Sequence, residues 1–347
     1  MLPLLHKFTS CYDFFPNDTI DSVIIEMNYN HEGHTRLVMN NTQIRLFVLI
    51  AESRSFTKAG LALNMTQPAV SRAISALEAE LDVKLMLRDR RSGLMLTDIG
   101  KRVLVICRGI LSGLDKIDQE IAAEKGLEKG QIRIGAFPVA AAYFVPKIIS
   151  AITARYPGIE ISLYEGSVAE VKDWLASRFI DVGLMIPPVE EFASLPLFRE
   201  KLYAVLPGSH PLHQKRIVCV KDLEAEPMLL CRSGYEPPVV DLFHRAGSML
   251  NVKYEVNSYI TALNMIQEGL AVGVMSQLSL LSLPPNVVVR ELSPDAYRDI
   301  HIAVHSLEET SIAVQLFIDT ALQLFSGNEA PPPSPAVAGL TNDTDKE

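Results

Sequence analysis

Three polar side chains in one short stretch could contact the bases of a nucleic acid. Gln67, Ser71 and Arg72 lie at helical spacing, so they can share a common outward side. Glutamine pairs with adenine and arginine with guanine, and serine can reach a base edge or a phosphate. The methyl group of Thr66 and the ring of Pro68 could touch a thymine methyl. An ordinary solvated helix face would show the same three polar residues, so the neighbouring elements must decide.

Two short helices around a tight turn are predicted to hold these side chains. Apolar spacing indicates a helix over 42–53, and Ser55, or a threonine two residues later, can cap a second helix over 58–63. Asn64 suits a left-handed turn position, and a third helix begins at Thr66. Two helices joined in this way form a helix-turn-helix, which places the first part of its second helix in the major groove.

Basic residues gather just downstream. Arg88, Arg90 and Arg91 form a turn before a short hairpin at 94–96. A basic hairpin beside a helix-turn-helix can act as a wing on phosphates or in the minor groove. A charged, solvated turn is the alternative for these arginines taken alone. Together the two features favour double-stranded DNA as a partner. The residues predicted to contact it are Ser55, Thr57, Thr66, Gln67, Pro68, Ser71, Arg72, Arg88, Arg90 and Arg91.

The distribution of charge supports this interpretation, although the whole chain is acidic. The 347 residues carry a formal net charge of −9. Residues 40–102 contain ten Lys and Arg against six Asp and Glu, a net charge of +4, which leaves −13 for the remainder. A small basic segment on a large acidic body can bind a polyanion, because electrostatic partners respond to local charge.

A long helix is predicted next, from a cap at Thr97 to the glycines near residue 130. Its apolar positions are spaced 4, 3, 4, 3, 4 and 4 residues apart, close to the heptad pattern of paired helices. These positions are Ile99, Val103, Ile106, Ile110, Gly113, Ile117 and Ile121. A long single helix with such a seam needs a partner helix, so we expect a homodimer.

From residue 131 the pattern changes to short apolar strands that alternate with helices, which predicts an α/β fold with parallel strands. Strands are expected at 132–135, 159–163, 180–186, 201–206, 228–230, 271–275, 287–291 and 299–305. Helices are expected at 145–156, 168–177, 239–246, 259–268 and 310–325.

The sequence disfavours several classes of protein. A chain of this length exceeds one ordinary hydrophobic core and suggests two or three domains. No apolar run reaches the ~18 residues of a membrane span, and the first residues make a poor secretory signal. We therefore expect a cytoplasmic protein that does not bind membranes.

Signals for metal binding, cofactor binding and catalysis are weak. The four cysteines contain no C-x-x-C pair, which argues against a zinc site or a disulfide framework. Phosphate-binding glycine loops and the common hydrolase and metalloprotease motifs are missing. Cys219 and Cys231 could form a redox switch, but the favoured interpretation is that both cysteines are buried and act as small hydrophobic residues. We expect no metal, no cofactor and no enzyme activity.

One continuous motif carries a family resemblance. It reads LFVLIAESRSFTKAGLALNMTQPAVSRAISALEAELDVKLMLRD, is followed by LTDIG and the long helix, and resembles the LysR-type family of bacterial transcriptional regulators. The resemblance continues more loosely to about Phe325. It implies a winged helix-turn-helix, a dimerising linker helix and a two-lobed α/β effector domain like a periplasmic binding protein. The implied function is sequence-specific DNA binding by a homodimer or homotetramer under control of a small-molecule effector. RNA polymerase would be a further partner of an activator.

The resemblance also implies how the chain divides. The expected parts are an extension at 1–38, which is either disordered or precedes the true start at Met39, a winged helix-turn-helix at 39–97, a linker helix at 98–130, an effector domain at 131–326 and a disordered tail at 327–347. The first lobe would comprise 131–204 and 292–326, and the second 205–291, with crossover strands near 203–206 and 288–291. Gly60 stands where the family usually has alanine, which costs about 1 kcal/mol in a helix interior.

The effector pocket is expected between the lobes, at the ends of strands. By family position its walls would include Phe137, Pro138, Val139, Met185, Ile186, Ser233, Gly234, Tyr235, Ile260 and Thr261. Residues 136–141 are apolar where many relatives have Ser or Thr, so backbone N–H groups alone would hold an anion there. A partly apolar or aromatic effector is expected. The alternative is that Phe137, Val139, Met185 and Ile186 are simply core residues.

A second interpretation of the whole chain is a cytoplasmic α/β protein that binds small molecules, or an enzyme, whose N-terminal helices are structural. The missing signal peptide argues against periplasmic solute capture, and the missing motifs argue against an enzyme. An assay of DNA binding distinguishes the two interpretations, because only the transcriptional regulator is expected to bind DNA.

Overall fold

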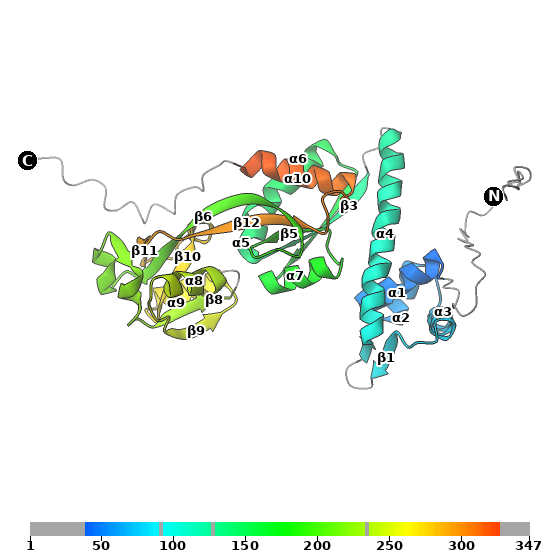
Figure 1. The fold of residues 1–347 in the computed structure, drawn as a ribbon, viewed down its shortest axis with the longest axis horizontal. Coiled ribbons are helices and arrows are strands. Elements are labelled where there is room, and N and C mark those ends of the chain that lie inside the picture. Colours follow the sequence, from blue (N-terminus) through cyan, green and yellow to red (C-terminus); the bar gives the residue numbers. More distant parts are fainter. Residues whose placement is uncertain (1–38, 90–92, 126–128, 233–235, 327–347) are drawn as a thin grey trace, which may run out of the picture. The chain divides into compact units, whose positions relative to one another are not determined.

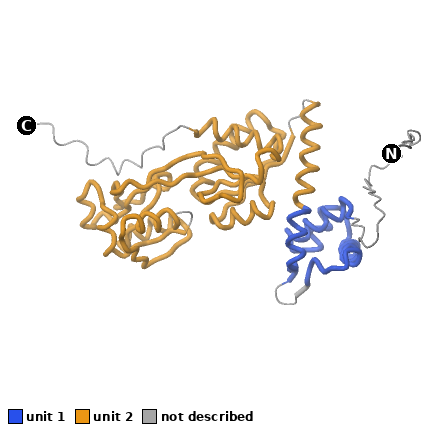
Figure 2. The backbone as a smooth tube through the Cα atoms, in the orientation of Figure 1, with its two compact units in different colours: residues 1–107 blue, residues 108–347 orange. Residues whose placement is uncertain are grey.

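A computed structural model of the chain describes residues 39–89, 93–125, 129–232 and 236–326. The chain forms two compact units, residues 1–107 and residues 108–347 (Figure 2). The described part of unit 1 contains three helices, a hairpin and the start of a long fourth helix, and unit 2 contains the rest of that helix and an α/β body (Figure 1). The predicted fold class, a winged helix-turn-helix joined by a long helix to a two-lobed α/β domain, is confirmed. Among the described residues, no helix is both long and apolar enough to cross a bilayer.

Unit 1 begins with the helix-turn-helix that the sequence predicts. Helices α1, α2 and α3 span Asn41–Ser53, Phe56–Ala62 and Gln67–Glu80. Asn40 starts α1 through a capping box, and Asn64 takes the predicted left-handed conformation, with φ at 53°. The apolar sides of the three helices meet in a small core. Its buried members include Leu46, Phe47, Ile50, Val70, Ile74 and Leu77.

A hairpin and the start of the long helix complete unit 1. Strand β1 (Met86–Asp89) pairs antiparallel with β2 (Gly93–Leu96), and α4 then spans Asp98–Glu124. Thr97 joins these elements, because its hydroxyl donates to the carbonyl of Lys84 at 2.7 Å and accepts the N–H of the third residue of α4 at 3.0 Å. The predicted cap at Thr97 is confirmed.

Two glycines of unit 1 allow close approach of the backbone. A Cβ atom added at Gly100 would lie 2.1 Å from the carbonyl oxygen of Leu85. A Cβ atom added at Gly60 would lie 2.6 Å from the carbonyl oxygen of Met65. Gly60 is therefore more than a weak helix former, because the turn between α2 and α3 approaches it too closely for a side chain.

The first lobe of unit 2 is built on parallel strands. Strand β3 pairs in parallel with β4 on one side and β5 on the other. The strands are β3 (Gly130–Ala136), β4 (Ile159–Glu165) and β5 (Val182–Met185). The helices are α5 (Pro138–Tyr143), α6 (Val145–Arg155), α7 (Val168–Ala176) and α10 (Ile312–Phe325).

The second lobe repeats this design with shorter elements. Strand β8 pairs in parallel with β9 and β10. Its strands are β7 (Ile217–Cys219), β8 (Met228–Cys231), β9 (Val252–Val256), β10 (Val272–Ser276) and β11 (Val287–Ser293). Its helices are α8 (Glu236–Arg245), α9 (Tyr259–Gln267) and the short 3-10 helices η1 (Pro211–Gln214), η2 (Val220–Leu223) and η3 (Gln277–Leu280).

Two long strands connect the lobes. Strand β6 spans Ala193–Pro207, whereas the sequence predicted a strand only at 201–206. It pairs with β12 (Tyr297–Val304) up to Lys201, and with β10 and β11 from Leu202 onward. The change of partner at residues 201–202 falls just before the crossover expected at 203–206. The first half of β6 was missed because Pro196 interrupts its strand pattern.

Candidate DNA-binding surface and effector cleft

Helix α3 carries four of the ten residues predicted to contact DNA. Val70 and Ile74 are buried and fix the inner side of the helix. Gln67 and Arg72 are exposed, and Ser71 is partly buried. Pro68 is also exposed, in the first turn of α3 as predicted. The structure thus brings these residues to one end of one helix. Ser75, which was not predicted to contact DNA, is also exposed one turn further along α3.

The residues predicted before α3 divide into two kinds. The hydroxyl of Ser55 accepts the N–H of Lys58 at 3.2 Å, so Ser55 caps α2. Thr57 and Thr66 are exposed, and the side chain of Thr66 makes no capping hydrogen bond although it precedes α3. Their hydroxyl groups are therefore accessible to phosphates.

The hairpin after α3 is held by a buried carboxylate. Glu78 accepts the backbone N–H groups of Leu85 and Met86 at 2.9 and 3.1 Å, and it pairs with Lys84 at 2.6 Å. Arg88 lies on β1, opposite Leu94 in the strand register. Of the remaining wing arginines, positions 90 and 91 lie outside the described residues. Glu78 therefore fixes the base of the predicted wing relative to α3.

Helix α4 leaves a row of isoleucines uncovered. Ile106, Ile110, Ile117 and Ile121 are exposed, with Ile117 at 55%. Ile99 and Val103, at the start of the predicted stripe, are partly buried. An uncovered apolar row at near-heptad spacing is typical of a helix that pairs with another helix.

Four of the ten residues predicted to line the effector pocket are buried in this structure. Phe137, Val139, Met185 and Ile186 are all buried. Met185 packs in a cluster with Val171 and Leu175 under α7. Their burial agrees with the alternative that they are core residues, and for Met185 it reflects a strand, β5, whose four residues are all buried.

The other described residues predicted to line the pocket lie on α5 and α9. Pro138 is partly buried at the start of α5, and Thr261 is exposed in the first turn of α9. Ile260 is 56% exposed and lines a groove of about 390 Å³ with Pro284 and Pro285. The predicted residues Ser233, Gly234 and Tyr235 lie outside the described residues.

A buried ion pair occupies the junction of the two lobes. The Arg298 Nε atom lies 2.5 Å from a carboxylate oxygen of Glu200, and both side chains are fully buried. Arg298 also donates to the hydroxyl of Ser276 at 2.8 Å, and Glu200 accepts the N–H of Leu278 at 2.9 Å. The guanidinium lies 5.3 Å from the ring centre of Phe137. This network links β6 and β12 to η3 and to the first loop of lobe 1, so it fixes the geometry of the junction.

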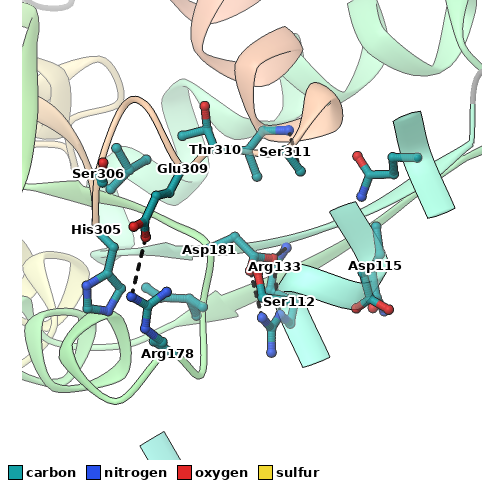
Figure 3. A pocket seen from close by; sticks show the side chains of 15 residues that line it. Ser112, Asp115, Arg133, Arg178, Asp181, His305, Ser306, Glu309, Thr310 and Ser311 are labelled. Carbon is teal, nitrogen blue, oxygen red and sulfur yellow. Dashed lines mark hydrogen bonds and ion pairs between the residues drawn. The ribbon is translucent and has the colours of Figure 1, made fainter. Parts of the chain in front are cut away.

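A second polar cluster lies where the later part of α4 meets lobe 1 (Figure 3). It surrounds a cavity of about 60 Å³ lined by Ser112 and Asp115 of α4, together with Arg178, His305 and Glu309 of the lobe. Arg178 pairs with Glu309 at 3.7 Å. Burial, together with the charge of Arg178, lowers the pKa of His305, so its imidazole is neutral at pH 7. Cavities that hold small-molecule effectors measure about 300–1,000 Å³.

The cysteines differ from the sequence expectation at one position. Cys231 is buried, as predicted, but Cys219 is exposed on β7. The prediction of two buried small residues is therefore wrong for Cys219, because β7 is a short strand that turns this side chain outward. Among the described residues, no group of three or more His, Cys, Asp or Glu could hold a metal ion.

Comparison with known proteins agrees with these features. The family model described as "Bacterial regulatory helix-turn-helix protein, lysR family" matches residues 41–101, and the model described as "LysR substrate binding domain" matches residues 125–326. The fold and the sites define a regulator of transcription with a DNA-binding head and an effector-binding body. The chain belongs to the LysR family of bacterial transcriptional regulators. Members of this family bind DNA and small-molecule effectors and form oligomers, and they are not enzymes.

Individual proteins show how far the similarity extends. The uncharacterized HTH-type transcriptional regulator YvbU of Bacillus subtilis is 52% identical over 289 residues, which cover 83% of this chain and 99% of that protein. A full-length variant of OxyR from Pseudomonas aeruginosa matches with a TM-score of 0.70 at 23% identity, over 84% of this chain and 99% of that one. CbnR in complex with its target DNA matches with a TM-score of 0.58 at 22% identity, over 82% and 99%. The last two similarities show a common fold.

Proposed function

We propose that α3 reads the base edges of an operator through Gln67, Ser71 and Arg72. The placement of Arg72 carries this proposal: its side chain is exposed in the second turn of α3, away from the buried Val70 and Ile74. An arginine at this place can donate two hydrogen bonds to one guanine, and Gln67 can pair with one adenine.

Phosphate contacts would orient α3 in the major groove. The exposed hydroxyls of Thr57 and Thr66 lie at the starts of α2 and α3, and helix starts favour anions. The wing would add Arg88, Arg90 and Arg91. These groups fix the register on the duplex but carry no base information.

The chain would divide into a DNA-binding domain at 39–97, a linker helix at 98–130 and an effector domain at 131–326. A second copy of the chain would pair along the exposed isoleucines of α4 in the linker. Two-fold symmetry then presents two copies of α3, which read half-sites about 10 bp, or a multiple of it, apart. Either one such dimer or a tetramer made of two such dimers satisfies this arrangement.

The effector would bind between the lobes, beside the two strands β6 and β12 that connect them. Pro138, Thr261 and residues 233–235 would line the site, above the buried Phe137 and Ile186. The buried floor is apolar, which supports a partly apolar or aromatic small molecule. Binding would favour one angle between the lobes and hence one separation of the DNA-binding heads. The protein would act in the cytoplasm, and as an activator it would also contact RNA polymerase.

The test uses the full-length chain and its own selected DNA. Genomic fragments are selected for binding, and the dissociation constant is measured for a selected site and for a random duplex. Arg72→Ala is expected to weaken the selected site about 5- to 150-fold, which corresponds to about 1–3 kcal/mol for one bidentate base contact. The random duplex should change far less.

Arg216→Ala is the matched control, because it removes one exposed arginine from lobe 2. It should leave both constants near their wild-type values. An Arg72→Ala protein that binds the selected site as tightly as wild type would overturn the proposal.

A further inference from the structure

The second half of α4 has two opposite sides. Arg108 and Gln119 are eleven residues apart, or about three helical turns, so their side chains leave α4 on the same side. Ile117 lies nine residues, or about two and a half turns, beyond Arg108 and therefore points the opposite way. The side with the isoleucines is exposed, whereas Arg108 and Gln119 are only 8% and 7% exposed.

Arg108 attaches α4 to the segment that follows α7. Its Nη1 atom donates a hydrogen bond to the carbonyl oxygen of Ser177 at 3.0 Å. Its guanidinium also lies 5.2 Å from the ring centre of Phe179. A buried arginine is costly unless it is hydrogen-bonded, so this side chain favours a state in which α4 stays against lobe 1.

Gln119 makes a second attachment, to the start of α10. Its side-chain oxygen accepts the backbone N–H of Ala313 at 3.1 Å, which satisfies one of the unpaired N–H groups of the first turn. Gly130 permits this approach, since an added Cβ atom would lie 2.8 Å from the Cβ of Ala313 and 3.1 Å from the Cδ of Gln119. The start of β3 is thus packed tightly against the same contact.

The space between the two attachments is polar. The cavity of about 60 Å³ lies there, and Figure 3 shows Ser112 and Asp115 of α4 facing Glu309 and Ser311 of lobe 1 across it. This volume has room for about two waters and is far below that of an effector site. Arg108 and Gln119 are two side chains of α4 whose hydrogen bonds to lobe 1 border this polar space.

We propose that Arg108 and Gln119 are positioning residues that make α4 and lobe 1 move as one body. A change in the angle between the lobes would then reach the DNA-binding unit through α4, and it would set the separation of the two half-sites that the dimer accepts. This inference rests on the proposed reading of DNA by α3 and on pairing through the isoleucine side of α4.

The first measurement is residue-resolved hydrogen exchange on the full-length protein. In Gln119→Leu the Ala313 N–H loses its acceptor, and its exchange is expected to accelerate about tenfold or more. The N–H of Val314 is the internal control, because it donates to the hydroxyl of Ser311 at 3.3 Å. Gln119→Glu keeps an oxygen acceptor at the start of α10 and should restore slow exchange at Ala313.

The second measurement uses three duplexes built from the selected operator: the native one, one with 5 bp inserted between the half-sites, and one with a single half-site. The insertion rotates one half-site by about half a turn of DNA. Wild type and Gln119→Glu are expected to prefer the native spacing about tenfold or more, and the Arg108→Leu/Gln119→Leu protein by less than about threefold. All three proteins should bind the single half-site alike. If Arg108→Leu prevents folding, Gln119→Leu alone is compared with Gln119→Glu.

A leucine variant that keeps the full spacing preference, or an Ala313 N–H that exchanges no faster, would overturn the inference. Neither result would affect the reading of DNA by α3, which fails only if Arg72→Ala binds the selected site as wild type does.

Discussion

The attachment of the wing to α3 through Glu78 gives a sharp test of how unit 1 is held together. The perturbation is Glu78→Leu, which keeps most of the side-chain volume and removes both oxygens. The carboxylate is 7% exposed and accepts the N–H groups of Leu85 and Met86, which both lie in buried residues. In the Glu78→Leu variant these two N–H groups lose their side-chain acceptor.

The magnitude follows from these contacts. Each buried N–H left without a partner costs about 1–3 kcal/mol, so the two together cost about 2–6 kcal/mol in the free energy of opening the hairpin. The ion pair with Lys84 adds only about 0–1 kcal/mol, because the lysine side chain is 68% exposed. Glu78→Gln retains an acceptor oxygen and should cost about 1–2 kcal/mol.

The charge of Glu78 also makes a prediction about pH. Burial by itself would raise the pKa of Glu78, but the hydrogen bonds from Lys84, Met86 and Leu85 outweigh burial and hold this pKa below its ordinary value of 4.5. A carboxyl group with a lowered pKa in the folded state stabilises that state fully above its unfolded pKa. That contribution is lost as the pH falls through the folded value. Protection of the hairpin should therefore decline below pH 4.5 in wild type but not in Glu78→Gln.

Hydrogen exchange at Leu85 and Met86 measures the opening directly, with amides in the middle of α1 as the control for global unfolding. Affinity for the selected operator gives a second readout, because a displaced wing would lose the phosphate contacts proposed for it. Equal protection of the two amides in wild type and Glu78→Leu would refute this account of the wing.

Two further predictions concern the dimer and the thiols. Ile117→Glu places a charge in the proposed helix pair and should weaken the dimer by roughly 2 kcal/mol or more, about 30-fold, in sedimentation equilibrium. Met249→Glu, at an exposed apolar position of lobe 2, should leave association unchanged, and an equal effect of both variants would contradict the pairing. Native thiol labelling with peptide mapping should modify the exposed Cys219 quickly and Cys107 only after unfolding, because burial raises the pKa of Cys107 to about 11. Labelling of Cys107 at the rate of Cys219 would show that unit 1 opens locally.

The sequence was sufficient where structure depends on local signals. The cap at Thr97, the left-handed Asn64 and Pro68 in the first turn of α3 each act within a few residues, and all three are found as predicted. The spacing of apolar residues also indicated α4, because the isoleucines from Ile106 to Ile121 follow one helical period and are exposed.

Features that depend on distant partners were not accessible in this way. The first half of β6 forms only because β12, about 100 residues later, pairs with it, and Glu200 and Arg298 meet across the same strands. Gln119 and Ala313 are 194 residues apart, and nothing near either one indicates the other. The predicted effector wall, which was taken from family position, contains both buried and exposed residues, because position in the sequence does not show what covers each side chain.

The most direct test of the central claim is sequencing of the sites that the full-length protein and its α3 variants select from a random DNA library. Arg72→Ala should lose preference for one guanine in each half-site, Gln67→Ala should lose preference for one adenine, and the other positions should stay as in wild type. Selected sites that are identical for wild type and both variants would contradict the claim that α3 reads base edges.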